Sequence, residues 1–188
     1  MNFESESHKE RESNIARINE TFDCFDLEPK IPIVVVDYIE GHEDAKMAFC
    51  FDEKDGEIVN ERYEISSENI DQESMDQEKI NNFVIHEVRH RAQRKKELED
   101  HDLDLFSEDM VLSIENITIR NYLIKYISSL PDDIRKNKRE LDSKVCEMLI
   151  NISIKESLIS DNEINSLIDK SNSYIISYLV SKISEVKR

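Results

Sequence analysis

Residues 75–99 form the stretch that most constrains how this chain can fold. The stretch contains no glycine or proline, and its apolar residues recur at the three- and four-residue spacing of a helix that buries one face. These residues are Ile80, Phe83, Val84, Val88 and Ala92. The pattern predicts an amphipathic helix. The whole chain has only 2 glycines and 3 prolines in 188 residues, which favours long helices throughout.

The predicted helix carries two histidines, His86 and His90, with Glu87 directly after the first. Residues four apart lie one turn apart on the same helical face, so both imidazoles can reach one point. Imidazole is a frequent zinc ligand. From its neighbouring position, Glu87 can reach a water molecule held by such a metal and act as a general base. The His-Glu-x-x-His pattern therefore predicts two ligands of a catalytic zinc site, together with its base.

A catalytic zinc site also needs a third protein ligand. The metzincin pattern would place a histidine at the position of Lys96, and His101 lies too far downstream, so that pattern is excluded. The remaining solution is a carboxylate from a separate, downstream helix. Glu140 is the first candidate, and Asp142 and Glu147 are the alternatives on the same segment.

With these residues the chain resembles the gluzincin metallopeptidases, particularly the small minigluzincin type of bacterial and phage proteins. The resemblance rests on the strand pattern that starts at Ile31, on residues 86–93, and on the Glu-x-Asp-Ser sequence at 140–143. It implies a zincin-like fold, zinc as the cofactor, peptide-bond hydrolysis as the reaction and Glu87 as the base. The zinc ligands that it implies are His86, His90 and Glu140.

The chain departs from the family that it resembles just after Glu140. Many gluzincins have an aspartate three or four residues after the ligand glutamate, where it supports a ligand histidine, whereas this chain has Ser143 and Lys144. Gln93 shares the face of the two histidines, and it is either a residue that supports the metal ligands or an ordinary surface residue of the helix. A second donor to the developing oxyanion is also expected. Its candidates are Tyr122, Tyr126 and His101.

The segment before this helix predicts a small sheet. Apolar and β-branched runs indicate strands at residues 31–37, 45–51 and 57–65, and Asp55-Gly56 is typical of a tight hairpin turn. Pro32 favours an edge or the start of a strand. An edge strand, with 45–51 as the candidate, would hold an extended peptide substrate by main-chain hydrogen bonds.

Helices are expected at residues 4–22, 107–129, 133–158 and 164–186, the last preceded by a capping sequence at 160–163. Strands followed by helices predict an α+β fold in which a three- to four-stranded sheet packs on the histidine-bearing helix, before a helical C-terminal half. The expected division is an N-terminal helix and linker at 1–30 and one zincin-like domain at 31–188. The apolar C-terminal helices could also form a dimer interface.

The net charge of −17 disfavours nucleic acid as a partner, because phosphate binding requires basic side chains. The sequence has no apolar run long enough to span a bilayer and no signal-peptide pattern at its acidic start, so a cytoplasmic protein is expected. Cys24, Cys50 and Cys146 have no metal-ligand spacing and are expected to be reduced thiols.

Two functions remain open at this point. The first is a zinc metallopeptidase that acts on a protein or peptide. The second is an acidic protein-interaction module or a DNA-mimic inhibitor without catalytic activity, to which the negative charge is suited. Metal content distinguishes the two, since only the first requires zinc.

Overall fold

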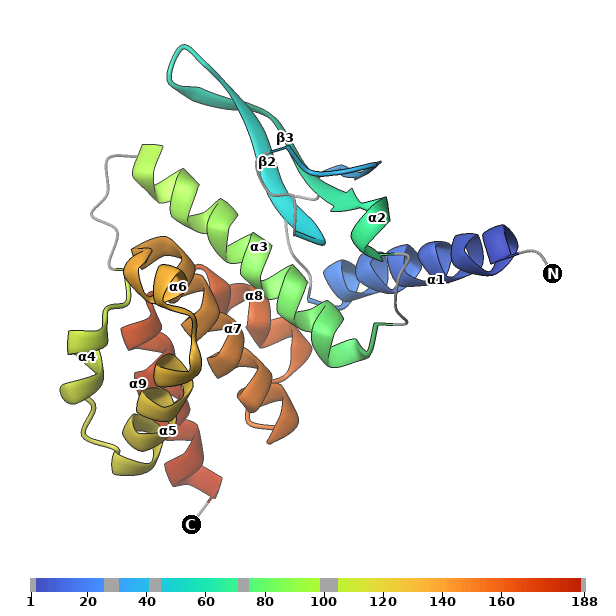
Figure 1. The fold of residues 1–188 in the computed structure, drawn as a ribbon. Coiled ribbons are helices and arrows are strands. Elements are labelled where there is room, and N and C mark those ends of the chain that lie inside the picture. Colours follow the sequence, from blue (N-terminus) through green and yellow to red (C-terminus); the bar gives the residue numbers. More distant parts are fainter. Residues whose placement is uncertain (1–2, 26–30, 41–44, 71–74, 99–104, 187–188) are drawn as a thin grey trace.

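The computed structural model describes residues 3–25, 31–40, 45–70, 75–98 and 105–186 (Figure 1). The order begins with helix α1 (Phe3–Cys24), strands β1 (Ile33–Val36), β2 (Met47–Lys54) and β3 (Glu57–Ser66), and helices α2 (Ser67–Ile70) and α3 (Gln77–Leu98). The C-terminal half contains α4 (Glu108–Leu112), α5 (Ile117–Ser129), α6 (Asp132–Lys136), α7 (Lys138–Lys155), α8 (Asp161–Ile168) and α9 (Asn172–Val186). The predicted α+β class is confirmed, with a small mixed sheet and mostly helical content.

The three strands pair in the order β1-β3-β2, so β1 and β2 are the two edges of the sheet that the described residues form. β1 runs parallel to β3 and β2 runs antiparallel to it. The predicted hairpin joins β2 to β3 through Asp55 and Gly56, whose φ angles of 54° and 83° are both left-handed. Two consecutive left-handed residues fit the type I′ turn that the Asp-Gly pair favours. The hairpin projects away from the helices (Figure 1).

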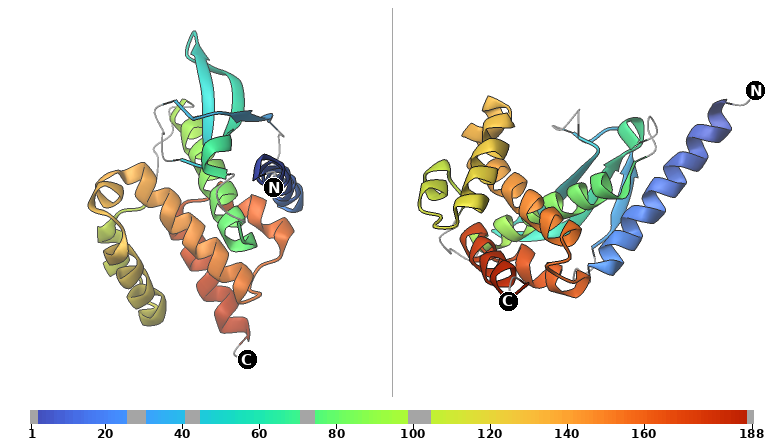
Figure 2. Two further views of the ribbon diagram at one scale, coloured as in Figure 1. Left: turned by 45° about the vertical axis from the view of Figure 1, so that its right-hand side comes forward. Right: turned by 90° about the horizontal axis from the view of Figure 1, so that it is seen from below.

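Helix α3 lies between the sheet and the C-terminal helices and packs on β2, α1, α7 and α8 (Figures 1 and 2). Four of the apolar residues that predicted this helix are buried. They are Ile80, Val84, Val88 and Ala92. On its other side, Leu141, Val145 and Leu149 of α7 complete the core. This central position places the residues of α3 in reach of both the sheet and α7.

The three long helices expected in the C-terminal half are each divided in two, because a polar side chain caps a new helix inside the expected run. The Asn116 side chain accepts hydrogen bonds from two backbone N–H groups and starts α5. Asn137 does the same for α7, and Ser171 accepts one from the backbone at the start of α9. Such caps satisfy the free N–H groups in the first turn of a helix. They therefore favour a new helix that starts at the capping residue over a continuation of the previous helix. The predicted capping box of Ser160 and Glu163 is present.

Helix α1 joins the sheet-bearing part of the fold through one buried face. Ile18 is fully buried, and the Asn14 side chain donates to the Ile70 carbonyl at 3.2 Å. Within the described residues, no helix is both long and apolar enough to cross a lipid bilayer.

Candidate metal site

Three of the predicted ligands meet between α3 and α7. His86 Nε2 lies 3.3 Å from one carboxylate oxygen of Glu140, and His90 Nε2 lies 3.2 Å from the other. The two Nε2 atoms are 3.0 Å apart, with the rings nearly perpendicular at 86°. Glu140 is in the first turn of α7 because Asn137 starts the helix there. The structure therefore brings two histidines of one helix to a carboxylate that follows His90 by fifty residues in the sequence.

A buried hydrogen-bond chain fixes how His90 faces this cluster. Gln93 Nε2 donates to Asp142 Oδ2 at 2.8 Å, because a carboxylate can only accept. Gln93 Oε1 is then left 3.1 Å from His90 Nδ1, so Nδ1 carries the proton and donates to it. Ser143 Oγ lies 3.4 Å from the same nitrogen. His90 Nε2 therefore presents a lone pair to the cluster, which is the tautomer that a metal ligand requires.

Glu147 supports His86 in a similar way. Its Oε2 lies 3.3 Å from His86 Nδ1, within ion-pair distance but off the line of a good hydrogen bond. Lys144 Nζ donates to the same oxygen at 2.9 Å. A carboxylate beside Nδ1 favours the proton on that nitrogen and leaves Nε2 with its lone pair. Glu147, an alternative for the third ligand, thus faces the wrong nitrogen of His86 for that role.

The spacing of the cluster fits a metal ion. A tetrahedral zinc with bonds of about 2.0–2.1 Å holds its ligand atoms about 3.3 Å apart. The separations among the two Nε2 atoms and the Glu140 oxygens are 3.0, 3.2 and 3.3 Å. Two imidazole lone pairs and a carboxylate aimed at one point repel each other unless a cation or a proton lies among them. Among the described residues, this is the group of histidine, cysteine and acidic side chains arranged to hold a metal ion.

Glu87 lies beside the cluster at the junction of α3 and the sheet. It is 8% exposed, and its Oε2 accepts a hydrogen bond from the Phe49 N–H of β2 at 2.8 Å. Burial raises the pKa of the Glu87 carboxyl, an effect that His86, His90 and the Phe49 N–H oppose. A carboxylate with a raised pKa is a better proton acceptor near neutral pH than an ordinary one.

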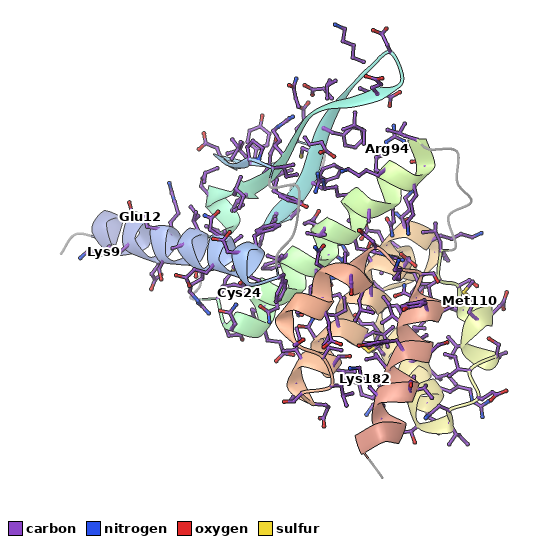
Figure 3. The ribbon with its side chains drawn as sticks, turned by 180° about the vertical axis from the view of Figure 1, so that it is seen from behind. Lys9, Glu12, Cys24, Arg94, Met110 and Lys182 are labelled. Atoms are coloured by element: carbon purple, nitrogen blue, oxygen red, sulfur yellow. The ribbon has the colours of Figure 1, made fainter. Side chains whose placement is uncertain are left out.

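A cleft of about 450 Å³ lies along β2 and exposes the cluster to solvent. We call it the strand-side cleft; β2 contributes Met47, Ala48, Phe49 and Phe51 to it, and α3 contributes His86, Glu87, His90, Gln93 and Arg94. Arg94 lies in the last turns of α3, next to the hairpin (Figure 3). Its guanidinium is 5.0 Å from the centre of the Phe51 ring. The expected edge strand therefore lines the cleft that contains His86, His90 and Glu140.

The structure does not place the other candidates for the third ligand and for oxyanion stabilisation in the cluster. Asp142 is fully buried and its Oδ2 accepts from Arg89 Nε at 2.7 Å, so it is an ion-pair partner. Tyr126 donates to the Lys144 carbonyl, and neither it nor Tyr122 lines the strand-side cleft of the described residues. The further candidate for oxyanion stabilisation, His101, lies outside the described residues.

The cysteines do not belong to the site. Cys24 is exposed, Cys50 is half-buried and Cys146 is buried, and each is a free thiol. Burial raises the pKa of Cys146 to about 12, and burial together with Glu64 raises that of Cys50 to about 11. Both thiols are therefore protonated near neutral pH, and neither is a nucleophile.

The cluster binds protons in the absence of metal. Burial alone would lower the pKa of His86, but Glu140 and Glu147 outweigh it and raise the pKa to about 9. The same contacts, to His86 first and then His90, hold the pKa of the Glu140 carboxyl well below its ordinary value. A proton on His86 thus takes the place among these groups that a cation would occupy.

This proton predicts opposite pH dependences for the metal-free and zinc-loaded protein. A histidine that is more basic when folded stabilises the fold below its unfolded pKa of 6.5, and this contribution is lost as the pH rises through 9. The metal-free protein should therefore lose up to about 3 kcal/mol between pH 6.5 and 9. Stabilisation by added zinc should grow over the same range, because zinc competes with that proton. Urea unfolding with EDTA or with zinc measures both; a metal-free protein that gains stability across this range would contradict the assignment.

Comparison of the chain with protein-family models, with curated proteins and with solved structures found no match. What the site can do must therefore follow from its own side chains and their arrangement. Sequence reasoning missed one of these side chains. The sequence predicts Glu147 only as an alternative ligand, although its spacing of seven residues from Glu140 places both on one face of α7, two turns apart.

Proposed function

We propose that this protein is a zinc-dependent metallopeptidase with a zincin-like arrangement of sheet, α3 and α7. The observation that carries the proposal is the convergence of His86 Nε2, His90 Nε2 and Glu140 on one point, with an amide oxygen beside Nδ1 of His90 and a carboxylate oxygen beside Nδ1 of His86. Two imidazoles and one carboxylate are the ligand set of many peptide-hydrolysing zinc sites. Bound there, zinc would polarise the scissile carbonyl and acidify a water molecule.

The side chains around the cluster have the parts that this reaction needs. Glu87 Oε2 is held by the Phe49 N–H, while Oε1 has no hydrogen-bond partner among the described residues. Oε1 can therefore accept a proton from the attacking water, and Glu87 can then pass this proton to the leaving amine. β2 is an edge strand of the sheet that the described residues form, so its main-chain groups other than the Phe49 N–H can hold an extended peptide across the cleft.

Elemental analysis of the untagged protein tests the metal site. About one zinc per chain is expected in the parent, and almost none in His86→Ala or Glu140→Ala, because two ligands hold zinc poorly. Glu147→Gln should retain the site but weaken zinc binding by roughly 10–100-fold, the usual effect of losing a group that orients a ligand histidine. Glu57→Gln, on the exposed strand after the hairpin, is the matched control.

The alternative of an acidic interaction module makes the opposite prediction. It expects no zinc in the parent protein and no change in any of these variants. Equal zinc content in the parent, His86→Ala and Glu140→Ala would contradict the proposed function.

A further inference from the structure

A second hollow, of about 410 Å³, lies between α3, α5 and α7. Six of its twelve lining residues carry a side-chain amide or a phenol, and we call it the amide pocket. These groups belong to Gln77, Asn81, Asn82, Tyr122, Tyr126 and Asn151. Nothing in the proposed reaction uses this pocket, yet Glu147, which supports His86, also lines it.

The amide pocket lies beyond the candidate metal site along both α3 and α7. Asn82 lies four residues before His86 on α3, and Asn151 lies four residues after Glu147 on α7. Each asparagine is therefore one helical turn, about 5.4 Å, beyond a residue of the metal site. An extended peptide advances about 3.3 Å per residue. A peptide that is cut at the candidate metal site and runs along α3 toward the N-terminal end of this helix would place its next one or two residues in the amide pocket.

The two asparagines have complementary free groups. Asn151 Nδ2 donates to the Glu147 carbonyl at 2.8 Å, which fixes the orientation of this amide because a carbonyl can only accept. The same nitrogen donates to Asn82, so the atom that Asn82 presents to it is Oδ1. Asn82 Nδ2 and Asn151 Oδ1 have no partner among the described residues. The pair thus leaves one donor and one acceptor, the complement of another amide group.

We infer that the amide pocket is a substrate subsite that binds an uncharged side-chain amide, that of an asparagine or a glutamine, within two residues of the scissile bond. This inference rests on the proposed peptidase function for its place in the reaction. The charges of the pocket agree with an uncharged ligand. Glu78 and Glu147 line it together with Lys155, which disfavours an acidic side chain.

Binding is tested by NMR on the 15N-labelled full-length protein, titrated with acetyl-Gly-Asn-Gly-amide both with and without added zinc. The side-chain NH₂ signals of Asn82 and Asn151 should shift saturably, and acetyl-Gly-Asp-Gly-amide should bind at least about 5-fold more weakly. Asn82→Leu should abolish the shift at Asn151. Asn82→Asp, which keeps the size but replaces the donor, should do the same and excludes a packing effect.

Asn19 provides the matched control. It is exposed on α1, and its Nδ2 also donates to a backbone carbonyl four residues earlier, at 3.0 Å. Its NH₂ signal should stay unchanged, and Asn19→Leu should leave peptide binding intact. Shifts at Asn82 and Asn151 no larger than those at Asn19, or equal binding of the Asn and Asp peptides, would overturn the inference.

Catalysis separates this inference from the proposed function. If the zinc-loaded protein cleaves a peptide mixture, Asn82→Leu should raise KM by about 10-fold with little change in kcat, as expected for lost binding. An unchanged KM would overturn the subsite. A protein that shows the amide shifts but cleaves nothing and binds no zinc would remove the peptidase function and leave a peptide-binding pocket.

Discussion

Glu87→Gln is expected to lower peptide hydrolysis by roughly 10²–10⁴-fold, the usual contribution of a positioned general base. Glutamine keeps the size of the side chain and an oxygen that can accept the Phe49 N–H, so the contact between α3 and β2 should survive. It cannot accept the proton of the attacking water. Zinc content should stay at the parent level, because Glu87 does not ligate the metal.

The measurement is kcat of zinc-loaded protein on a mixture of casein peptides, with zinc determined in the same samples. Glu57→Gln should retain full activity and controls for the loss of one negative charge at an exposed position. Undiminished hydrolysis by Glu87→Gln would show that another group is the base. Loss of zinc from this variant would mean that Glu87 belongs to the ligand set.

Asp142→Asn is expected to reduce the free energy of unfolding by about 3 kcal/mol, because it leaves the buried Arg89 guanidinium without a counter-charge. The two side chains are 4% and 0% exposed, and Asp142 also accepts from Gln93, the Phe106 N–H and Asn172. Urea unfolding of the metal-free protein measures the loss. The exposed Asp109→Asn on α4 should change stability by at most about 0.5 kcal/mol.

A double-mutant cycle sharpens this result. The double variant Arg89→Leu/Asp142→Leu should lose less unfolding free energy than the sum of the two single variants, by about 1.5–3 kcal/mol. Each single variant leaves one buried charge without its partner, whereas the double variant removes both charges. Simple additivity would show that the ion pair does not couple α3 to α7. Asp142→Leu should also weaken zinc binding, since Gln93 then loses the acceptor that holds it toward His90.

The parts of the site that follow from local periodicity could be predicted from sequence. His86, Glu87 and His90 share one turn of one helix, and their relation is fixed once that helix forms. The hairpin at Asp55-Gly56 is equally local, because the left-handed turn is a property of those two residues. Local periodicity alone does not predict Glu140 as a ligand. That prediction depended on the resemblance to a family whose third ligand comes from a separate downstream helix.

The rest depends on contacts between segments far apart in the chain. No spacing rule reveals that Gln93 donates to Asp142 or that Arg89 pairs with it, because those pairings arise only when α3 packs on α7. The divided helices were missed for a different reason. Asn116 and Asn137 stand in runs without proline or glycine, and their capping outweighs the apolar periodicity that continues through them.

The edge position of β2, which suits peptide binding, also exposes the strand to pairing with other copies of the chain. An open strand edge can pair with the same strand of another copy, which is a common route to aggregation in sheet proteins. Here α3 lies against β2, and Glu87 already occupies the Phe49 N–H when another copy approaches. The net charge of −17 adds repulsion between copies at longer range. The same acidity therefore favours colloidal stability, and it leaves the edge of β2 most accessible to peptides that are neutral or positively charged.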